Sequence, residues 1–129
     1  MDPEYWGPKG WYFIHSVALA YPEAPTSVHK ENYKLFFKNL GNVLPCPICQ
    51  EHYRINYIEA ELDNALESRI LLFNWTVDLH NKVNIEKDKP TYTYKEALDA
   101  LHNGYDNTNY NVYIYIFLII IIIYLLKNK

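Results

Sequence analysis

Two cysteines in the segment Leu44-Pro45-Cys46-Pro47-Ile48-Cys49 are the residues of this sequence best suited to chemistry. Pro47 favours the first position of a helix, which places Cys46 just ahead of a helix N-terminus. There, free backbone N–H groups and the helix dipole stabilise a thiolate. Cys49 follows one turn later, close enough to close a disulfide with Cys46 and on the same helix face as His52. The spacing therefore predicts a redox dithiol in which Cys46 exchanges with an incoming thiol.

A C-x-x-C pair also has other uses, and the sequence leaves a zinc site open. In thioredoxin-like proteins the pair follows a β-strand, whereas here it follows an amphipathic helical pattern, which argues against that fold. A structural zinc site could recruit His52 and His80, although a second ligand pair at finger-like spacing is missing. A non-catalytic, membrane-anchored zinc-binding or adaptor module is therefore the alternative to an enzyme.

A helical stripe further along the chain changes from apolar to polar within one turn. Ile70, Phe73 and Val77 begin the stripe at helical spacing. Its continuation is polar and consists of His80, Asn81 and Asn84. Unpaired buried groups of this kind cost about 1 to 3 kcal/mol each, so the face should meet water, a partner side chain or a ligand.

Trp11 and His15 provide a second indication of a ligand. They stand four residues apart, so an aromatic plane and an imidazole share one helix face, on which a flat heteroaromatic ring can stack. Together with the dithiol they point to a cofactor. A thiol isomerase or reductase would need only the dithiol, and it would leave the polar face without a purpose.

The elements that must position these residues are expected to be helices. Apolar residues such as Tyr33, Phe36, Phe37 and Leu40 recur at i, i+3, i+4 and i+7. Capping residues and prolines then set the ends. The expected helices are 8–20, from Thr26 or Ser27 to Val43, 47–59, 67–86 and a shorter one at 94–102. The sequence thus predicts an all-α domain over residues 1–105.

Composition excludes several classes of function. Half of the residues are hydrophobic, with 13 Tyr and 3 Trp, which suffices for a folded core. The net charge is -3 and the lysines are mixed with acids, so nucleic acid is not expected as a partner. The first residues are acidic and aromatic and do not read as a secretory signal, so we expect the domain in a cytosolic compartment.

The C-terminal segment is much more apolar than the rest. Residues 112–126 contain no charge, amide or glycine, and lysines follow at 127 and 129. We expect a linker over 106–111 and a single transmembrane anchor over 112–126, in a host or virion membrane with the catalytic domain facing the cytosol. A helix of that length spans about 22 Å, short of a bilayer core of about 30 Å, so a buried core helix or strand is the alternative.

The chain resembles the Erv/ALR family of FAD-linked sulfhydryl oxidases, and in particular the compact members found in large DNA viruses. The resemblance is collinear from residue 6 to about residue 94. The matching motifs are Trp6-Gly7, Trp11 to His15, Tyr21-Pro22 with Pro25-Thr26, Pro45-Cys46 to Cys49, Trp75 to His80-Asn81, Val83-Asn84, Lys89-Pro90 and Tyr92.

The resemblance implies a four-helix bundle with a short fifth helix, which holds FAD and forms a homodimer. Cys46 would meet the substrate and Cys49 would face the flavin, with electrons passing on to dioxygen to give hydrogen peroxide. Lys89 would serve as a point charge for the pyrophosphate. The implied FAD contacts are Trp11, His15, Trp75, His80, Asn81, Val83, Asn84 and Lys89.

Two departures from the family pattern carry expectations of their own. Val77 and Tyr94 stand where many members have a structural disulfide, so packing is expected to replace it. The shuttle dithiol of many relatives is also missing. The resemblance therefore implies a thioredoxin-like or glutaredoxin-like dithiol protein as the direct electron donor at the Cys46 surface.

Overall fold

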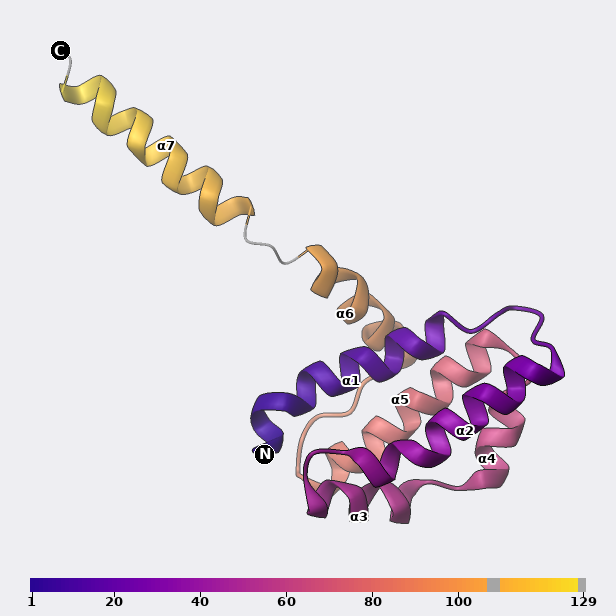
Figure 1. The fold of residues 1–129 in the computed structure, drawn as a ribbon. Helices are drawn as coiled ribbons and strands as arrows, with labels where there is room; N and C mark the ends of the chain where they lie inside the picture. The colour runs from indigo at the N-terminus through magenta and orange to yellow at the C-terminus, as the bar shows by residue number, and fades with distance from the viewer. Residues whose placement is uncertain (107–109, 128–129) are drawn as a thin grey trace. The chain divides into compact units, whose positions relative to one another are not determined.

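The computed structural model describes residues 1–106 and 110–127, and over these residues all regular structure is helical (Figure 1). This confirms the all-α class. The helices are α1 (Pro3–Leu19), α2 (Ser27–Val43), α3 (Pro47–Asn56), α4 (Glu59–Ala65), α5 (Arg69–Glu86), α6 (Tyr94–Asp106) and α7 (Tyr110–Lys127). The chain forms two compact units, Met1–Ala97 and Leu98–Lys129, and the first contains the residues expected to do chemistry.

Helix α1 begins five residues before the expected start. Asp2 is the N-cap, its side chain accepts a hydrogen bond from the backbone N–H of Glu4 at 2.9 Å, and Pro3 takes the first helical position. Pro8 therefore lies inside the helix rather than at its start. The Asp-Pro pair at residues 2 and 3 was the stronger start signal.

The expected helix 47–59 is divided in two in the structure. Helix α3 ends at Asn56 because Tyr57 is extended, with φ -77° and ψ 119°. A separate helix, α4, follows and was not expected. It buries Leu62 completely and packs on α5, so its position depends on tertiary contact more than on its own short sequence.

Helix α5 lies at the centre of the Met1–Ala97 unit, where it contacts α1, α3 and α4. Ile70, expected to begin its buried stripe, is 59% exposed, whereas Phe73 and Val77 are each 1% exposed. The buried face therefore starts two residues later, at Leu72.

Helices α2 and α3 approach closely at Gly41. A Cβ atom on Gly41 would lie 2.6 Å from Cδ1 of Tyr53, so a residue without a side chain is needed there. The buried Tyr53 hydroxyl donates a hydrogen bond to the carbonyl oxygen of Phe37 at 2.7 Å. This contact fixes the helix that carries the two cysteines.

The Leu98–Lys129 unit contains α7, whose described side chains from Tyr115 to Tyr124 and at Leu126 are all exposed. Part of the expected linker, residues 107–109, lies outside the described residues. Among the helices over 1–106 and 110–127, none is both long and apolar enough to cross a membrane, so the transmembrane helix expected over 112–126 is not found.

Candidate active site

The two cysteines form a disulfide at the N-terminus of α3. Cys46 is the N-cap residue, Pro47 follows at the first helical position, and Sγ of Cys46 accepts a hydrogen bond from the backbone N–H of Cys49 at 3.3 Å. The prediction that Cys46 precedes a helix N-terminus is confirmed. A sulfur that already accepts a backbone N–H is well placed to carry negative charge once the disulfide is reduced.

The exposure of the two cysteines differs from the expectation. Cys46, expected to meet the substrate, is only 5% exposed. Cys49 is half-buried and lines a cavity. The capping position explains why Cys46 is less exposed than Cys49, because it turns the Cys46 sulfur back over the end of its own helix.

The cavity lies in the Met1–Ala97 unit and has a volume of about 300 Å³, which is the size of a small-molecule site. It is lined from α1, α3, α5 and the segment that follows α5. Of the residues implied by the family resemblance, those in its lining are Trp11, Cys49, His80, Val83, Asn84 and Lys89.

Trp11 and His80 form a flat wall of this cavity. Their rings stack with centroids 4.1 Å apart and planes inclined by 10°. Burial lowers the pKa of His80 to about 3, with smaller contributions from His15 and Lys89. His80 is therefore neutral near pH 7 and offers an uncharged, planar surface beside Trp11.

His15 lies behind this wall and is 5% exposed. Its Nε2 is 3.1 Å from Nδ1 of His80, and its Nδ1 is 2.9 Å from the hydroxyl oxygen of Thr76. Burial lowers the pKa of His15 to about 4. His15 thus supports His80 from the protein interior, and Thr76 is a neighbour that the sequence did not single out.

Besides His15, two more of the implied FAD contacts are outside the lining. Trp75 is buried against Phe37 and Tyr57, with ring centroids 5.1 and 6.2 Å away. The Asn81 side chain exchanges hydrogen bonds of 2.8 and 2.9 Å with the backbone of Tyr92. Asn81 therefore holds Tyr92, which does line the cavity.

The position of the missing structural disulfide is held by hydrogen bonds. Val77 is buried, whereas Tyr94 is 45% exposed. The Tyr94 hydroxyl lies 3.1 Å from each carboxylate oxygen of Asp78. The start of α6 is thus connected to α5 through Asp78, and not only by apolar packing as expected.

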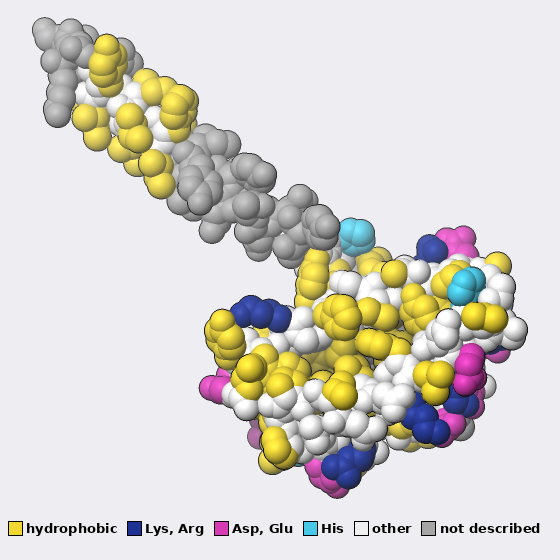
Figure 2. Space-filling view, viewed as in Figure 1, with side chains coloured by type: hydrophobic (Ala, Val, Ile, Leu, Met, Phe, Trp, Pro, Cys, Tyr) yellow, Lys and Arg dark blue, Asp and Glu magenta, His cyan; other side chains and the backbone are white. Residues whose placement is uncertain are grey.

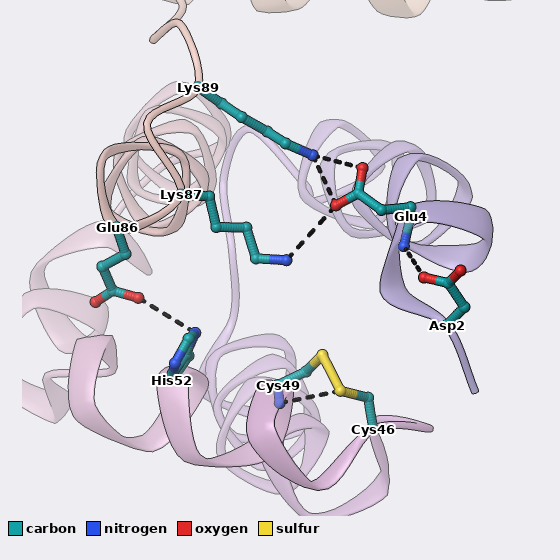
Figure 3. Close-up of polar contacts among 8 residues, drawn as sticks. All are labelled: Asp2, Glu4, Cys46, Cys49, His52, Glu86, Lys87 and Lys89. Atoms are coloured by element: carbon teal, nitrogen blue, oxygen red, sulfur yellow. Dashed lines mark hydrogen bonds and ion pairs between the residues drawn. A yellow bond between two sulfur atoms is a disulfide. The ribbon is translucent and has the colours of Figure 1, made fainter.

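A tight turn after α5 presents two lysines to the cavity (Figure 3). Asp88 has φ 50°, and the backbone N–H groups of Asp88 and Lys89 return to the carbonyls of Ile85 and Asn84. Nζ of Lys89 contacts both carboxylate oxygens of Glu4, and Nζ of Lys87 is 3.9 Å from one of them. The hydrogen bond from Lys89 is the main cause that lowers the pKa of Glu4.

His52 is a functional candidate that sequence reasoning considered only as a neighbour of Cys49 or a zinc ligand. It lines the cavity, and its Nδ1 is 3.4 Å from a carboxylate oxygen of Glu86 (Figure 3). The side-chain amide of Asn56 donates to the other Glu86 oxygen at 2.8 Å. Glu86 is distant in sequence from His52. The sequence could therefore have indicated a role for His52 beside the redox pair only through its i, i+3 spacing to Cys49.

Two buried donors in the lining have no hydrogen-bond partner within the described part of the chain. They are Nε1 of Trp6 and Nδ2 of Asn84. Gly10 leaves space for the Trp6 ring, because a Cβ there would lie 2.8 Å from it. Both donors would be satisfied by acceptor atoms of a bound molecule.

The described residues contain no group of three or more His, Cys, Asp or Glu side chains that could hold a metal ion. The ligand set of the zinc alternative, which needed His52 and His80 beside the cysteines, is therefore not assembled there.

Comparison with known proteins agrees with this fold and site. The Erv1 / Alr family model matches residues 8–103. A protein of Acanthamoeba polyphaga mimivirus, named as a probable FAD-linked sulfhydryl oxidase, is 44% identical over 102 residues, covering 78% of this chain and 71% of that protein. The mitochondrial FAD-linked sulfhydryl oxidase of Saccharomyces cerevisiae is 37% identical over 93 residues, covering 70% and 47% of the two chains.

The structural comparison reaches the same family. The crystal structure of the FAD binding domain of Erv1 from Saccharomyces cerevisiae superimposes with a TM-score of 0.67 at 32% identity, covering 81% of this chain and 97% of that one. The helical fold and the dithiol beside a planar-walled cavity define a small helical redox protein. The chain belongs to the Erv1 / Alr family.

Proposed function

We propose that this protein is an FAD-linked sulfhydryl oxidase that makes disulfide bonds in a partner protein through the Cys46–Cys49 pair. The observation that carries the proposal is the position of the disulfide. It caps α3, and Cys49 lines the same cavity as the stacked rings of Trp11 and His80. Relatives with this activity in their names support it.

The cavity fits FAD by the chemistry of its lining. Trp11 and His80 offer a neutral flat wall for a planar ring, and Trp6 and Asn84 have unpartnered donors for oxygen or nitrogen acceptors. Lys87 and Lys89 are suited to phosphate groups. Val83 adds apolar contact. His15 and Asn81 would act by supporting His80 and Tyr92 in the lining, whereas Trp75 packs outside it.

Cys46 and Cys49 perform the thiol chemistry. A substrate thiolate attacks Cys46, the bond between the two cysteine sulfurs breaks, and Cys49 leaves as a thiolate. The second thiol of the substrate then displaces Cys46, so the substrate gains a disulfide and the enzyme is left as a dithiol. When bound, FAD supplies the acceptor for these two electrons and passes them to dioxygen, giving hydrogen peroxide.

His52 can hold a proton beside Cys49 during this exchange. Its Nδ1 lies 3.4 Å from a carboxylate oxygen of Glu86, which orients the ring and leaves Nε2 for a second partner. On the same helix face, Nε2 can accept the proton of the Cys49 thiol, and the N-terminus of α3 would stabilise the thiolate that results.

The surface of α1 and α2 supports a homodimer. Phe13, Leu35 and Val43 are 55%, 47% and 72% exposed. A shallow hollow there is lined by residues that include Leu35, Phe36 and Val43. Figure 2 shows hydrophobic side chains gathered on the face of the Met1–Ala97 unit that carries these helices. Sedimentation of wild type and Leu35→Lys tests this, since the variant should be monomeric.

The dithiol partner is proposed to be a thioredoxin-like or glutaredoxin-like protein. Sequence composition supports this, because the chain has no cysteines besides Cys46 and Cys49 to act as a shuttle. A membrane location is supported by the exposed apolar side chains of α7. The catalytic domain is proposed to face the cytosol. Extraction of cell membranes with carbonate tests it, since a protein released into the supernatant would argue against an anchor.

The visible absorption spectrum of the purified chain tests the proposed activity. Flavin bands should bleach when a dithiol is added without oxygen and return when air is admitted. A colourless protein that contains one zinc ion per chain would instead support the zinc-binding module and contradict the oxidase.

A further inference from the structure

We infer that the hydroxyl of Thr76 sets the tautomers of His15 and His80, so that His80 presents an unprotonated nitrogen and the cavity selects a hydrogen-bond donor there. Thr76 is thus a positioning residue for ligand recognition. The inference deepens the proposed function, because the cavity is the one to which FAD is assigned.

The direction of the first hydrogen bond follows from the single proton of the Thr76 hydroxyl. Oγ1 of Thr76 donates to the carbonyl oxygen of Phe73 at 2.7 Å. Thr76 is completely buried, so solvent does not compete for that proton. Towards His15, whose Nδ1 is 2.9 Å away, Oγ1 can therefore only accept. The proton of neutral His15 must be on Nδ1.

The second hydrogen bond follows from the first. With its proton on Nδ1, neutral His15 has a bare lone pair on Nε2. That atom is 3.1 Å from Nδ1 of His80, so Nδ1 of His80 must donate. Burial keeps both imidazoles neutral at pH 7, because it lowers their pKa values to about 4 and about 3. His80 is then left with a lone pair on Nε2.

The free nitrogen of His80 is on the ring edge away from His15. Among the described residues, the hydrogen bond to His15 is the one recorded for the His80 side chain. The ring itself is held in place by stacking on Trp11 and lines the cavity. A hydrogen-bonded chain from the Phe73 carbonyl through Thr76 and His15 thus ends in an acceptor at the cavity.

This acceptor and the donors elsewhere in the lining require opposite hydrogen-bonding groups of a ligand. Trp6 and Asn84 have buried donors that require acceptor atoms. Nε2 of His80 instead requires a hydroxyl or an N–H group and disfavours a phosphate or carboxylate oxygen. Sites of this kind strongly discriminate against analogues that lack the matching group, because a buried polar atom would be left unpaired.

The tautomers can be measured directly by ¹⁵N NMR on the full chain labelled with ¹⁵N-histidine. At pH 7, His15 and His80 should both show Nδ1 protonated and Nε2 bare. Thr76→Val keeps the shape of the side chain but removes the hydroxyl, so the protons should move to Nε2. Thr76→Ser, which keeps the hydroxyl, should retain the wild-type pattern. A wild-type His80 with its proton on Nε2 would overturn the inference without any variant.

Affinity for FAD gives the second readout. Thr76→Val should raise the dissociation constant for FAD by about tenfold, the effect of one lost hydrogen bond. Thr76→Ser, which keeps the hydroxyl, should retain most of the wild-type affinity. Equal weakening in both variants would contradict the inference. The two proposals can fail separately, because a chain that binds no flavin but has the expected tautomers contradicts only the proposed function.

Discussion

Nζ of Lys89 lies 2.9 and 2.7 Å from the two carboxylate oxygens of Glu4, and the two residues are 85 positions apart in the chain. The contact connects the start of α1 to the turn after α5 (Figure 3). It also means that the lysine proposed to bind a pyrophosphate already has an anionic partner. Glu4 therefore competes with a phosphate group for the same cation.

Replacing Glu4 with Gln should strengthen FAD binding. The variant removes the competing carboxylate and leaves Lys87 and Lys89 free, so the dissociation constant should fall by about two- to tenfold at low salt. Flavin fluorescence titration measures this. Glu23→Gln is the matched control, since Glu23 pairs with Arg69 outside the cavity. Unchanged or weaker binding in Glu4→Gln would show that Glu4 supports the site instead.

Replacing Cys46 with Ser should abolish oxidation of a dithiol while preserving the fold. Serine is a good N-cap residue, so its hydroxyl can replace the sulfur as acceptor for the Cys49 N–H. Cys49 then remains as a free thiol that lines the cavity and should perturb the flavin spectrum. Oxygen consumption and absorbance measure the two effects. Normal oxidase activity in this variant would contradict the assigned roles.

His52 should control the reactivity of Cys49. In the Cys46→Ser protein, His52→Asn should move the pH midpoint of Cys49 alkylation upward, because the thiol loses the imidazole that can accept its proton. Glu86→Gln should cause a smaller shift in the same direction, since Glu86 acts through His52. His29→Gln, near the start of α2, is the control and should leave the alkylation profile unchanged.

The free energy of unfolding should decrease as the pH falls below about 6.5. His15 and His80 have folded-state pKa values of about 4 and about 3, below the ordinary value of 6.5. Between those limits the unfolded chain binds protons that the folded chain does not, so each histidine costs up to about 1.4 kcal/mol per pH unit. Urea unfolding at pH 7 and pH 5 measures the loss. Above pH 7 the two histidines make a constant contribution to the free energy of unfolding. A urea midpoint that is unchanged between pH 7 and pH 5 would argue against two buried neutral histidines.

Gly41→Ala should destabilise the domain. The new Cβ would lie 2.6 Å from Cδ1 of Tyr53, and overpacking of this kind costs about 1 to 3 kcal/mol, against a gain of about 1 kcal/mol in helix propensity. Thermal unfolding checks the change. Gly7→Ala is the matched control, because a Cβ there meets no atom within 4 Å and the variant should be neutral or slightly more stable.

The local features of this protein were predictable from its sequence. The N-cap position of Cys46 and the helix that follows depend on neighbouring residues and proline geometry. The all-α class follows from apolar spacing, which repeats within each helix. The family resemblance added the set of cavity residues. Five of its eight implied FAD contacts lie in the lining together with Cys49, namely Trp11, His80, Val83, Asn84 and Lys89.

Tertiary structure decided the remaining features, because they join residues from different helices. His15 meets Thr76 and His80 across 61 and 65 positions, and His52 meets Glu86 across two helices. Helical periodicity assigns a side chain to a face, whereas the packing of one helix on another determines which partner that face meets and how much solvent reaches it.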